Sequence, residues 1–98
     1  MELRGEVIDG DGYEHKVPTA NVLMQKPIPE GVYRGNAWLG SDLLGRSLVW
    51  VVPYRAAIAE VYVSKWRKSL RGSFLSVTDL KQVNRKEMMK YYDEALAT

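Results

Sequence analysis

The tetrapeptide Pro18-Thr19-Ala20-Asn21 carries the first side chains whose types and spacing could do chemistry. At the start of a strand, alternate residues share a face, so the Thr19 hydroxyl and the Asn21 amide oxygen would point the same way. Two hard oxygen atoms so placed could bind one Mg²⁺, which takes one or two protein oxygens and completes its shell with water and phosphates. The alternative is that both side chains satisfy backbone groups at a turn and a strand end.

Glu60 is the second candidate, because it interrupts an otherwise apolar run from Ala56 to Val63. A period of two places it on one strand face with Ile58 and Tyr62. If that face points into the mouth of a barrel, the carboxylate could act as a general base. If the face is exposed to solvent, Glu60 is the polar member of an alternating strand, and the sequence leaves both interpretations open.

The elements that would position these groups are short strands, which alternation and turn residues define over the first three quarters of the chain. A polar segment from Asp9 to Pro18 contains Gly10 and Gly12 and is predicted to be an exposed loop. The predicted strands are Glu2 to Ile8, Ala20 to Met24, Val32 to Leu39, Arg46 to Val52, Ala57 to Trp66 and a sixth over Leu70 to Leu75.

The last quarter of the chain changes period. Ser76-Val77-Thr78-Asp79 has the form of a capping box and predicts a helix from Asp79 to Leu96. Consecutive strands followed by one amphipathic helix predict a mainly β protein. We expect a small antiparallel β-barrel, with one C-terminal α-helix that covers an open end or edge.

Length and composition limit the classes of protein that remain. A chain of 98 residues forms one domain, residues 1–98, and its 46% hydrophobic and 27% charged residues are ordinary for a soluble globular protein. Without cysteine it has no disulfide and no thiolate metal site. No segment has the pattern of a membrane span or a secretory signal, so we expect a cytoplasmic protein. A net charge of +2 does not indicate a nucleic-acid or membrane partner.

Several motifs occur in a fixed order along the chain. They are Gly5 to Gly10, Pro18 to Asn21, Gly31-Val32-Tyr33, Pro53 before Glu60-Val61, Leu70-Arg71 with Phe74 and Ser76, and Leu80. In this order they resemble the riboflavin kinases, or flavokinases, and the most specific parts are the PTAN tetrapeptide and the P-x-G-V-Y turn that follows it. The resemblance spans most of the chain.

The resemblance implies a small antiparallel β-barrel with a C-terminal helix. It implies transfer of the γ-phosphoryl group of ATP to the 5′-hydroxyl of riboflavin, which gives FMN. Thr19 and Asn21 would then hold the Mg²⁺ of the nucleotide, and Glu60 would accept the proton of the ribityl hydroxyl. The small-molecule partners would be riboflavin or FMN and an adenine nucleotide, with Mg²⁺ and ATP as cofactors.

The same resemblance assigns the loop before the PTAN motif to the nucleotide. Backbone N–H groups around Gly10 and Gly12 would donate hydrogen bonds to the phosphates, with Lys16 and Pro18 beside them. In riboflavin kinases this loop is longer and richer in glycine, and Lys16 stands where the family has a glycine. Lys16 either partly replaces the backbone hydrogen-bond donors that the shorter loop lacks or is simply exposed to solvent.

Riboflavin kinases also have a strand pair between the glutamate and the Leu-Arg element. Here Val61 to Trp66 runs almost directly into Leu70-Arg71. We therefore expect a shortened barrel with an exposed strand edge over Ala57 to Trp66. Two such edges could pair, which predicts a homodimer; a helix folded over the edge would instead leave a monomer.

Two other functions are compatible with the sequence. A catalytically impaired member of the family could keep the pocket and bind a flavin or nucleotide without turnover. A small barrel could instead bind single-stranded nucleic acid through Tyr54 and Trp66 among basic neighbours. The nearly balanced charge and the order of the motifs speak against the nucleic-acid function.

Overall fold

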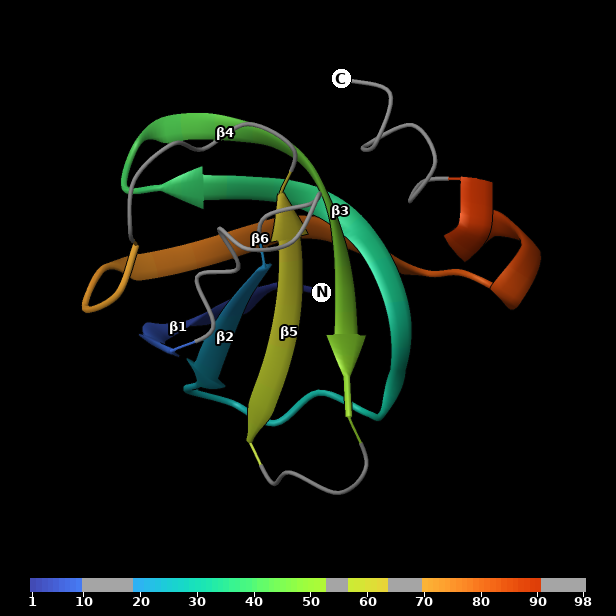
Figure 1. The fold of residues 1–98 in the computed structure, drawn as a ribbon, viewed down its shortest axis with the longest axis horizontal. Coiled ribbons are helices and arrows are strands. Elements are labelled where there is room, and N and C mark those ends of the chain that lie inside the picture. The colour runs from blue at the N-terminus through green and yellow to red at the C-terminus, as the bar shows by residue number, and fades with distance from the viewer. Residues whose placement is uncertain (10–18, 53–56, 64–69, 91–98) are drawn as a thin grey trace.

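A closed antiparallel barrel makes up most of the computed structural model, which describes residues 1–9, 19–52, 57–63 and 70–90. Within these ranges the six strands follow one another around the barrel in the order β1-β2-β5-β4-β3-β6 (Figure 1). Their bounds are β1 (Leu3–Asp9), β2 (Thr19–Met24), β3 (Gly31–Leu39), β4 (Asp42–Val51), β5 (Ile58–Val63) and β6 (Phe74–Gln82). Residues 85–90 are helical. The predicted mainly β fold, an antiparallel barrel followed by one C-terminal helix, is confirmed.

The barrel interior is filled by the residues at alternate positions of each strand. Ala59, Val61 and Val63 of β5 are fully buried, as are Ala20 and Val22 of β2. Because successive side chains of a strand point to opposite faces, the residues between them lie on the outside of the barrel. Asn21, Glu60 and Tyr62 are therefore on the outer face.

Gly5 permits a close backbone contact between β1 and β2. It lies on the buried face of β1, opposite Met24 of β2 and Leu75 of β6. A Cβ atom at this position would overlap the carbonyl oxygen of Leu23 and lie 2.8 Å from Cγ1 of Val22. Only glycine fits here without moving backbone.

The predicted start of the helix is wrong, because the segment Ser76 to Asp79 belongs to β6. A bulge in β6 is the reason. Asp79 has a positive φ of 56°, and the register between β3 and β6 shifts between Arg34 and Asn36. The extra residue places the buried Leu80 three positions after the buried Val77. Val83, just beyond the end of β6, is buried three positions later, and this spacing imitates the period of a helix.

The predicted exposed strand edge is also wrong. β6 follows Leu70 and pairs with both β1 and β3, which closes the barrel. β5 pairs on one side with β2 and on the other with β4, so the described strands leave no open edge there. The homodimer predicted from that edge loses its structural basis. Residues 64–69, at the end of the predicted fifth strand, lie outside the described residues.

The start of the sixth strand also differs from the prediction. Arg71 and Gly72 form a turn, closed by a hydrogen bond from the Ser73 N–H to the Leu70 carbonyl (2.8 Å). The Arg71 Nε–H donates to the carbonyl of Ile8 at 2.9 Å and so ties this turn to β1. In the described ranges, no helix has the length and apolar character needed to cross a membrane.

Replacing Gly5 by alanine should destabilise the barrel by about 3 kcal/mol, since the added methyl group must displace backbone as well as side chains. Urea unfolding followed by circular dichroism measures the change. The neighbouring, exposed Glu6→Ala is the control and should change the free energy of unfolding by less than about 0.5 kcal/mol. Equal stability of the two variants would show that β1 and β2 do not approach as closely as described.

Candidate functional site

Asn21 and Glu60 occupy directly opposite positions on the paired strands β2 and β5. Directly opposite residues of an antiparallel pair have Cβ atoms about 5 Å apart and project from the same face. Both side chains are half-buried on the outer face of the barrel. The pairing places the amide and the carboxylate side by side, although they are far apart in the sequence.

Thr19 joins this pair from the next position on the same face of β2. It lies opposite Tyr62 and is 9% exposed. The structure therefore brings Thr19, Asn21 and Glu60 onto one patch of the outer surface. Asp9, at the end of β1, is the register partner of Asn21 on its other side. The other predicted site residues, Gly10, Gly12, Lys16 and Pro18, lie outside the described residues.

Glu60 lies on the outer face of the barrel and not inside its mouth. Its two register partners are Asn21 on β2 and Trp50 on β4. The carboxylate is thus flanked by a polar side chain and by a large aromatic one. This position is neither a fully solvated strand face nor the interior that the sequence left open for it.

An apolar pocket adjoins Glu60 on the same face. It encloses about 510 Å³, which is in the usual range for small-ligand sites. Its lining consists of Val32, Leu48, Trp50, Tyr62, Arg85, Met88 and Met89. Glu60 is not one of the lining residues, but Trp50 lies opposite it and Tyr62 follows it on the same strand face, so Glu60 is next to two residues at the edge of this pocket.

Sequence reasoning missed part of this pocket. Large aromatic side chains on strands are usually part of the core, but Trp50 is 38% exposed and lines the pocket. Trp38 is half-buried and donates from its indole Nε1–H to Oγ1 of Thr78 at 2.9 Å. The consecutive methionines Met88 and Met89 were a usable signal, since flexible thioether side chains are common at adaptable binding surfaces.

Asn84 fixes the helix that carries these methionines. Its Oδ1 accepts a hydrogen bond from the Glu87 N–H at 2.8 Å, and its carbonyl accepts one from the Met88 N–H at 2.9 Å. Asn84 is therefore the N-cap, with Glu87 at the third helical position. Just before it, the Val83 N–H donates to the carbonyl of Val32 at 2.9 Å and anchors the helix start beside β3.

The donor set at this patch suits a hard divalent cation that is shared with a ligand. A hydroxyl and an amide oxygen lie on one face, next to a carboxylate, and Mg²⁺ prefers oxygen ligands. The described residues contain no group of three or more His, Cys, Asp or Glu that could enclose a metal by themselves. If a cation binds here, Thr19 and Asn21 are the residues that would hold it, and its remaining ligands would come from water and phosphate.

The comparison with known families identifies the class to which this architecture belongs. Residues 1–96 match the flavokinase family model, which is described as riboflavin kinase. The match covers nearly the whole chain, and the chain belongs to this family. No match was found among curated proteins.

A solved structure shares the fold. The crystal structure of a macrolide-efflux protein from Streptococcus pneumoniae superposes with a TM-score of 0.70 at 20% sequence identity. The similarity covers 99% of this chain and 36% of that one, so the chain described here spans little more than a third of its length. At this identity the likeness is one of fold.

Removal of the Asn84 cap should loosen the helix without unfolding the barrel. Asn84→Ala should increase amide hydrogen exchange over residues 85–90 about fivefold, because losing an N-cap costs about 1 kcal/mol. Asn84→Ser, which keeps a capping oxygen, should exchange nearly as slowly as the unmodified protein. Unchanged exchange in Asn84→Ala would show that the cap does not hold this helix.

Proposed function

We propose that the protein is a riboflavin kinase that transfers the γ-phosphoryl group of Mg²⁺-ATP to the 5′-hydroxyl of riboflavin. The observation that carries the proposal is the direct pairing of Asn21 with Glu60 at the edge of an apolar pocket. Phosphoryl transfer depends mainly on positioning and charge neutralisation, with one base to orient the attacking hydroxyl. Membership of the flavokinase family supports the same reaction.

Thr19 and Asn21 would bind the nucleotide end of the site. Their oxygen atoms lie on one strand face, so they can ligate one cation without rearranging the backbone. Mg²⁺ bound there would neutralise charge on the transferred phosphoryl group. The proposal also assigns the backbone around Gly10 and Gly12, with Lys16 and Pro18, to the nucleotide phosphates.

Glu60 would act on the acceptor. Its carboxylate would accept the proton of the ribityl 5′-hydroxyl as the oxygen forms its bond to the γ-phosphorus. The bond between that phosphorus and the bridging oxygen of ATP breaks, and ADP leaves with the electron pair. The products are FMN and ADP, and the proton is released from Glu60 after the transfer.

The apolar pocket would hold the flavin ring. Trp50 and Tyr62 offer aromatic faces for a planar ring, and Met88 and Met89 line the pocket from the helix. A ring placed there would direct its ribityl chain toward Glu60, which lies at the pocket edge. The use of ATP as phosphate donor agrees with a cytoplasmic location.

Glu60→Gln should lower the rate of FMN formation by at least about a hundredfold and leave riboflavin affinity nearly unchanged, since it removes the proton acceptor but keeps the shape. Asn21→Ala should instead weaken binding of Mg²⁺-ATP, seen as a raised KM for ATP. Coupled detection of ADP and fluorescence of FMN measure the two effects.

Three outcomes would contradict this assignment. Equal loss of riboflavin affinity in both variants would show that these residues only support the fold. A Glu60→Gln variant as active as the unmodified protein would exclude the base. If the unmodified protein is stabilised by riboflavin in a thermal shift but forms no FMN, the alternative of a flavin-binding module without turnover would replace the kinase.

Trp50→Ala should lower riboflavin affinity about tenfold, because truncating a central aromatic side chain of a binding surface removes much of the contact. Quenching of riboflavin fluorescence measures the affinity. Trp38→Phe is the matched control, because Trp38 does not line the pocket, and it should bind riboflavin as before. Unchanged affinity in Trp50→Ala would place the flavin elsewhere.

A further inference from the structure

A guanidinium-bearing side chain reaches the apolar pocket from the C-terminal helix. Arg85, the first residue of the helical segment 85–90, lines the pocket together with Met88 and Met89. Residues three and four positions apart lie on one face of a helix, so one helix face brings all three side chains to the pocket. The proposed function places the riboflavin ring in this pocket and gives Arg85 no part in binding it.

Arg85 and Glu60 lie at opposite sides of the pocket. The Val83 N–H donates to the carbonyl of Val32 at 2.9 Å, so the helix starts beside β3. Val32 lies opposite Trp50 of β4, and Trp50 lies opposite Glu60 of β5. Two strand spacings, about 10 Å, therefore separate Glu60 from the side on which the helix begins.

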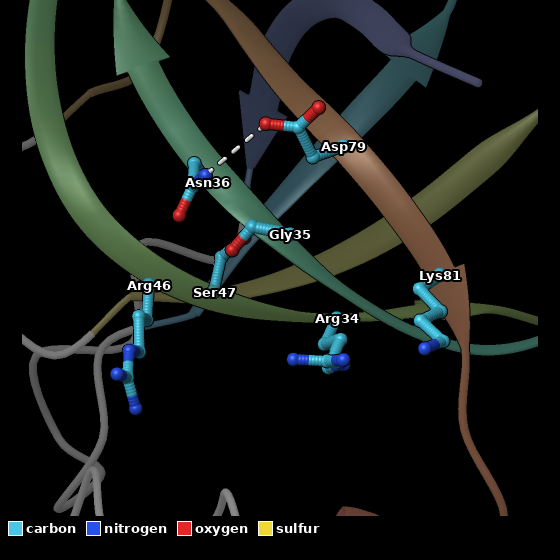
Figure 2. Close-up of a pocket in the computed structure, with 7 residues that line it drawn as sticks. All are labelled: Arg34, Gly35, Asn36, Arg46, Ser47, Asp79 and Lys81. Atoms are coloured by element: carbon cyan, nitrogen blue, oxygen red, sulfur yellow. Dashed lines mark hydrogen bonds between the residues drawn. The ribbon is translucent and has the colours of Figure 1, made fainter.

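The basic side chains of the neighbouring strands line a different hollow. Arg34, Arg46 and Lys81 belong to a polar groove over β3, β4 and β6 (Figure 2). None of these three residues lines the apolar pocket, and the strand residues described in its lining are all apolar or aromatic. Within the described part of the chain, the charged hydrogen-bond donor of the apolar pocket therefore comes from the helix and not from the sheet.

The place of Arg85 in the helix gives the helix itself no advantage. Asn84 is the N-cap, so Arg85 is in the first turn, where the partial charge of the helix end is positive. A cation at that position is not stabilised by the helix dipole. The position of Arg85 is therefore better explained by what its side chain contacts in the pocket than by the stability of the helix.

The two long edges of the isoalloxazine ring of riboflavin differ in chemistry. One edge carries the ribityl chain on N10. The opposite edge carries N5 and the carbonyl oxygen O4, which are neighbouring hydrogen-bond acceptors in oxidised flavin. When the ribityl chain runs toward Glu60, N5 and O4 face the other side of the pocket, which is the side from which Arg85 enters.

We propose that Arg85 makes the pocket specific for oxidised flavin by donating hydrogen bonds to N5 and O4, an inference that rests on the proposed function. Its guanidinium presents donors in a planar fork, which matches two neighbouring acceptors. In reduced flavin N5 carries a hydrogen atom, so a donor faces a donor and one hydrogen bond is lost. Arg85 therefore favours oxidised over reduced riboflavin.

The test compares riboflavin with 5-deazariboflavin, in which a C–H group replaces N5 and the shape of the ring is kept. Calorimetric titration of the full chain without ATP measures both affinities. The unmodified protein should bind riboflavin about fivefold more tightly, as expected for one hydrogen bond to a charged donor at an exposed site. Arg85→Met keeps an unbranched apolar stem and removes the donors, so it should bind both flavins with equal affinity.

Lys86→Met is the matched control, because Lys86 is in the same turn of the helix and does not line the pocket. This variant should keep the fivefold preference for riboflavin. A ratio of two affinities within one variant cancels any general weakening of the pocket or the helix. Loss of the preference in Arg85→Met alone therefore reports the contact with N5 and not a structural role of the arginine.

Three results would overturn the role of Arg85. They are equal affinity of the unmodified protein for the two flavins, an unchanged preference in Arg85→Met, and the same loss of preference in Lys86→Met. If the unmodified protein binds neither flavin, the proposed flavin pocket fails and the role of Arg85 fails with it.

A separate assay of FMN formation with Mg²⁺-ATP distinguishes this failure from that of the kinase. FMN formation together with an unchanged preference in Arg85→Met leaves the kinase standing without a role for Arg85. Absence of FMN formation together with the expected affinities leaves Arg85 standing as a specificity residue of a flavin-binding module.

Discussion

The inward packing of small and β-branched side chains from β5 is the constraint on which the outer surface depends. Ala59, Val61 and Val63 are fully buried at the centre of a closed barrel, with a paired strand on each side. A strand held in this way cannot shift its register by one residue without exposing its apolar side chains and burying its polar ones. Glu60 and Tyr62 are therefore fixed on the outside, at positions that the neighbouring strands determine.

Because the barrel is closed, the pairing of the strands determines which side chains are neighbours on the outer surface. β2 brings Asn21 to one side of Glu60, and β4 brings Trp50 to the other. Polar side chains lie toward β2, and the apolar pocket lies toward β4, where residues of the capped helix contribute to its lining. The order of the strands around the barrel therefore places the proposed nucleotide-binding residues on one side of Glu60 and the proposed flavin pocket on the other.

The bulge at Asp79 is a second constraint, and it acts on both the core and the surface. It lets Leu80 return to the barrel interior and turns Lys81 outward beside Arg34. One residue with a positive φ therefore contributes to core packing and also determines which side chain lies opposite Arg34 on the outer face. The same irregularity explains why a helix was wrongly predicted to begin at Asp79, because three-residue spacing of buried side chains is also typical of a helix.

The sequence by itself determined the barrel class, the approximate position of five strands, and the residue types of the candidate site, because period-two alternation and turn residues are local properties. It could not place Asn21 beside Glu60, since register between distant strands depends on how the whole barrel closes. It also could not show that the sixth strand continues to Gln82, because the bulge at Asp79 interrupts the alternation. Nor could it reveal the pocket around Trp50, which requires a helix and three strands to meet. The local sequence pattern determines where strands can form, but only tertiary packing determines which strand faces lie on the same surface.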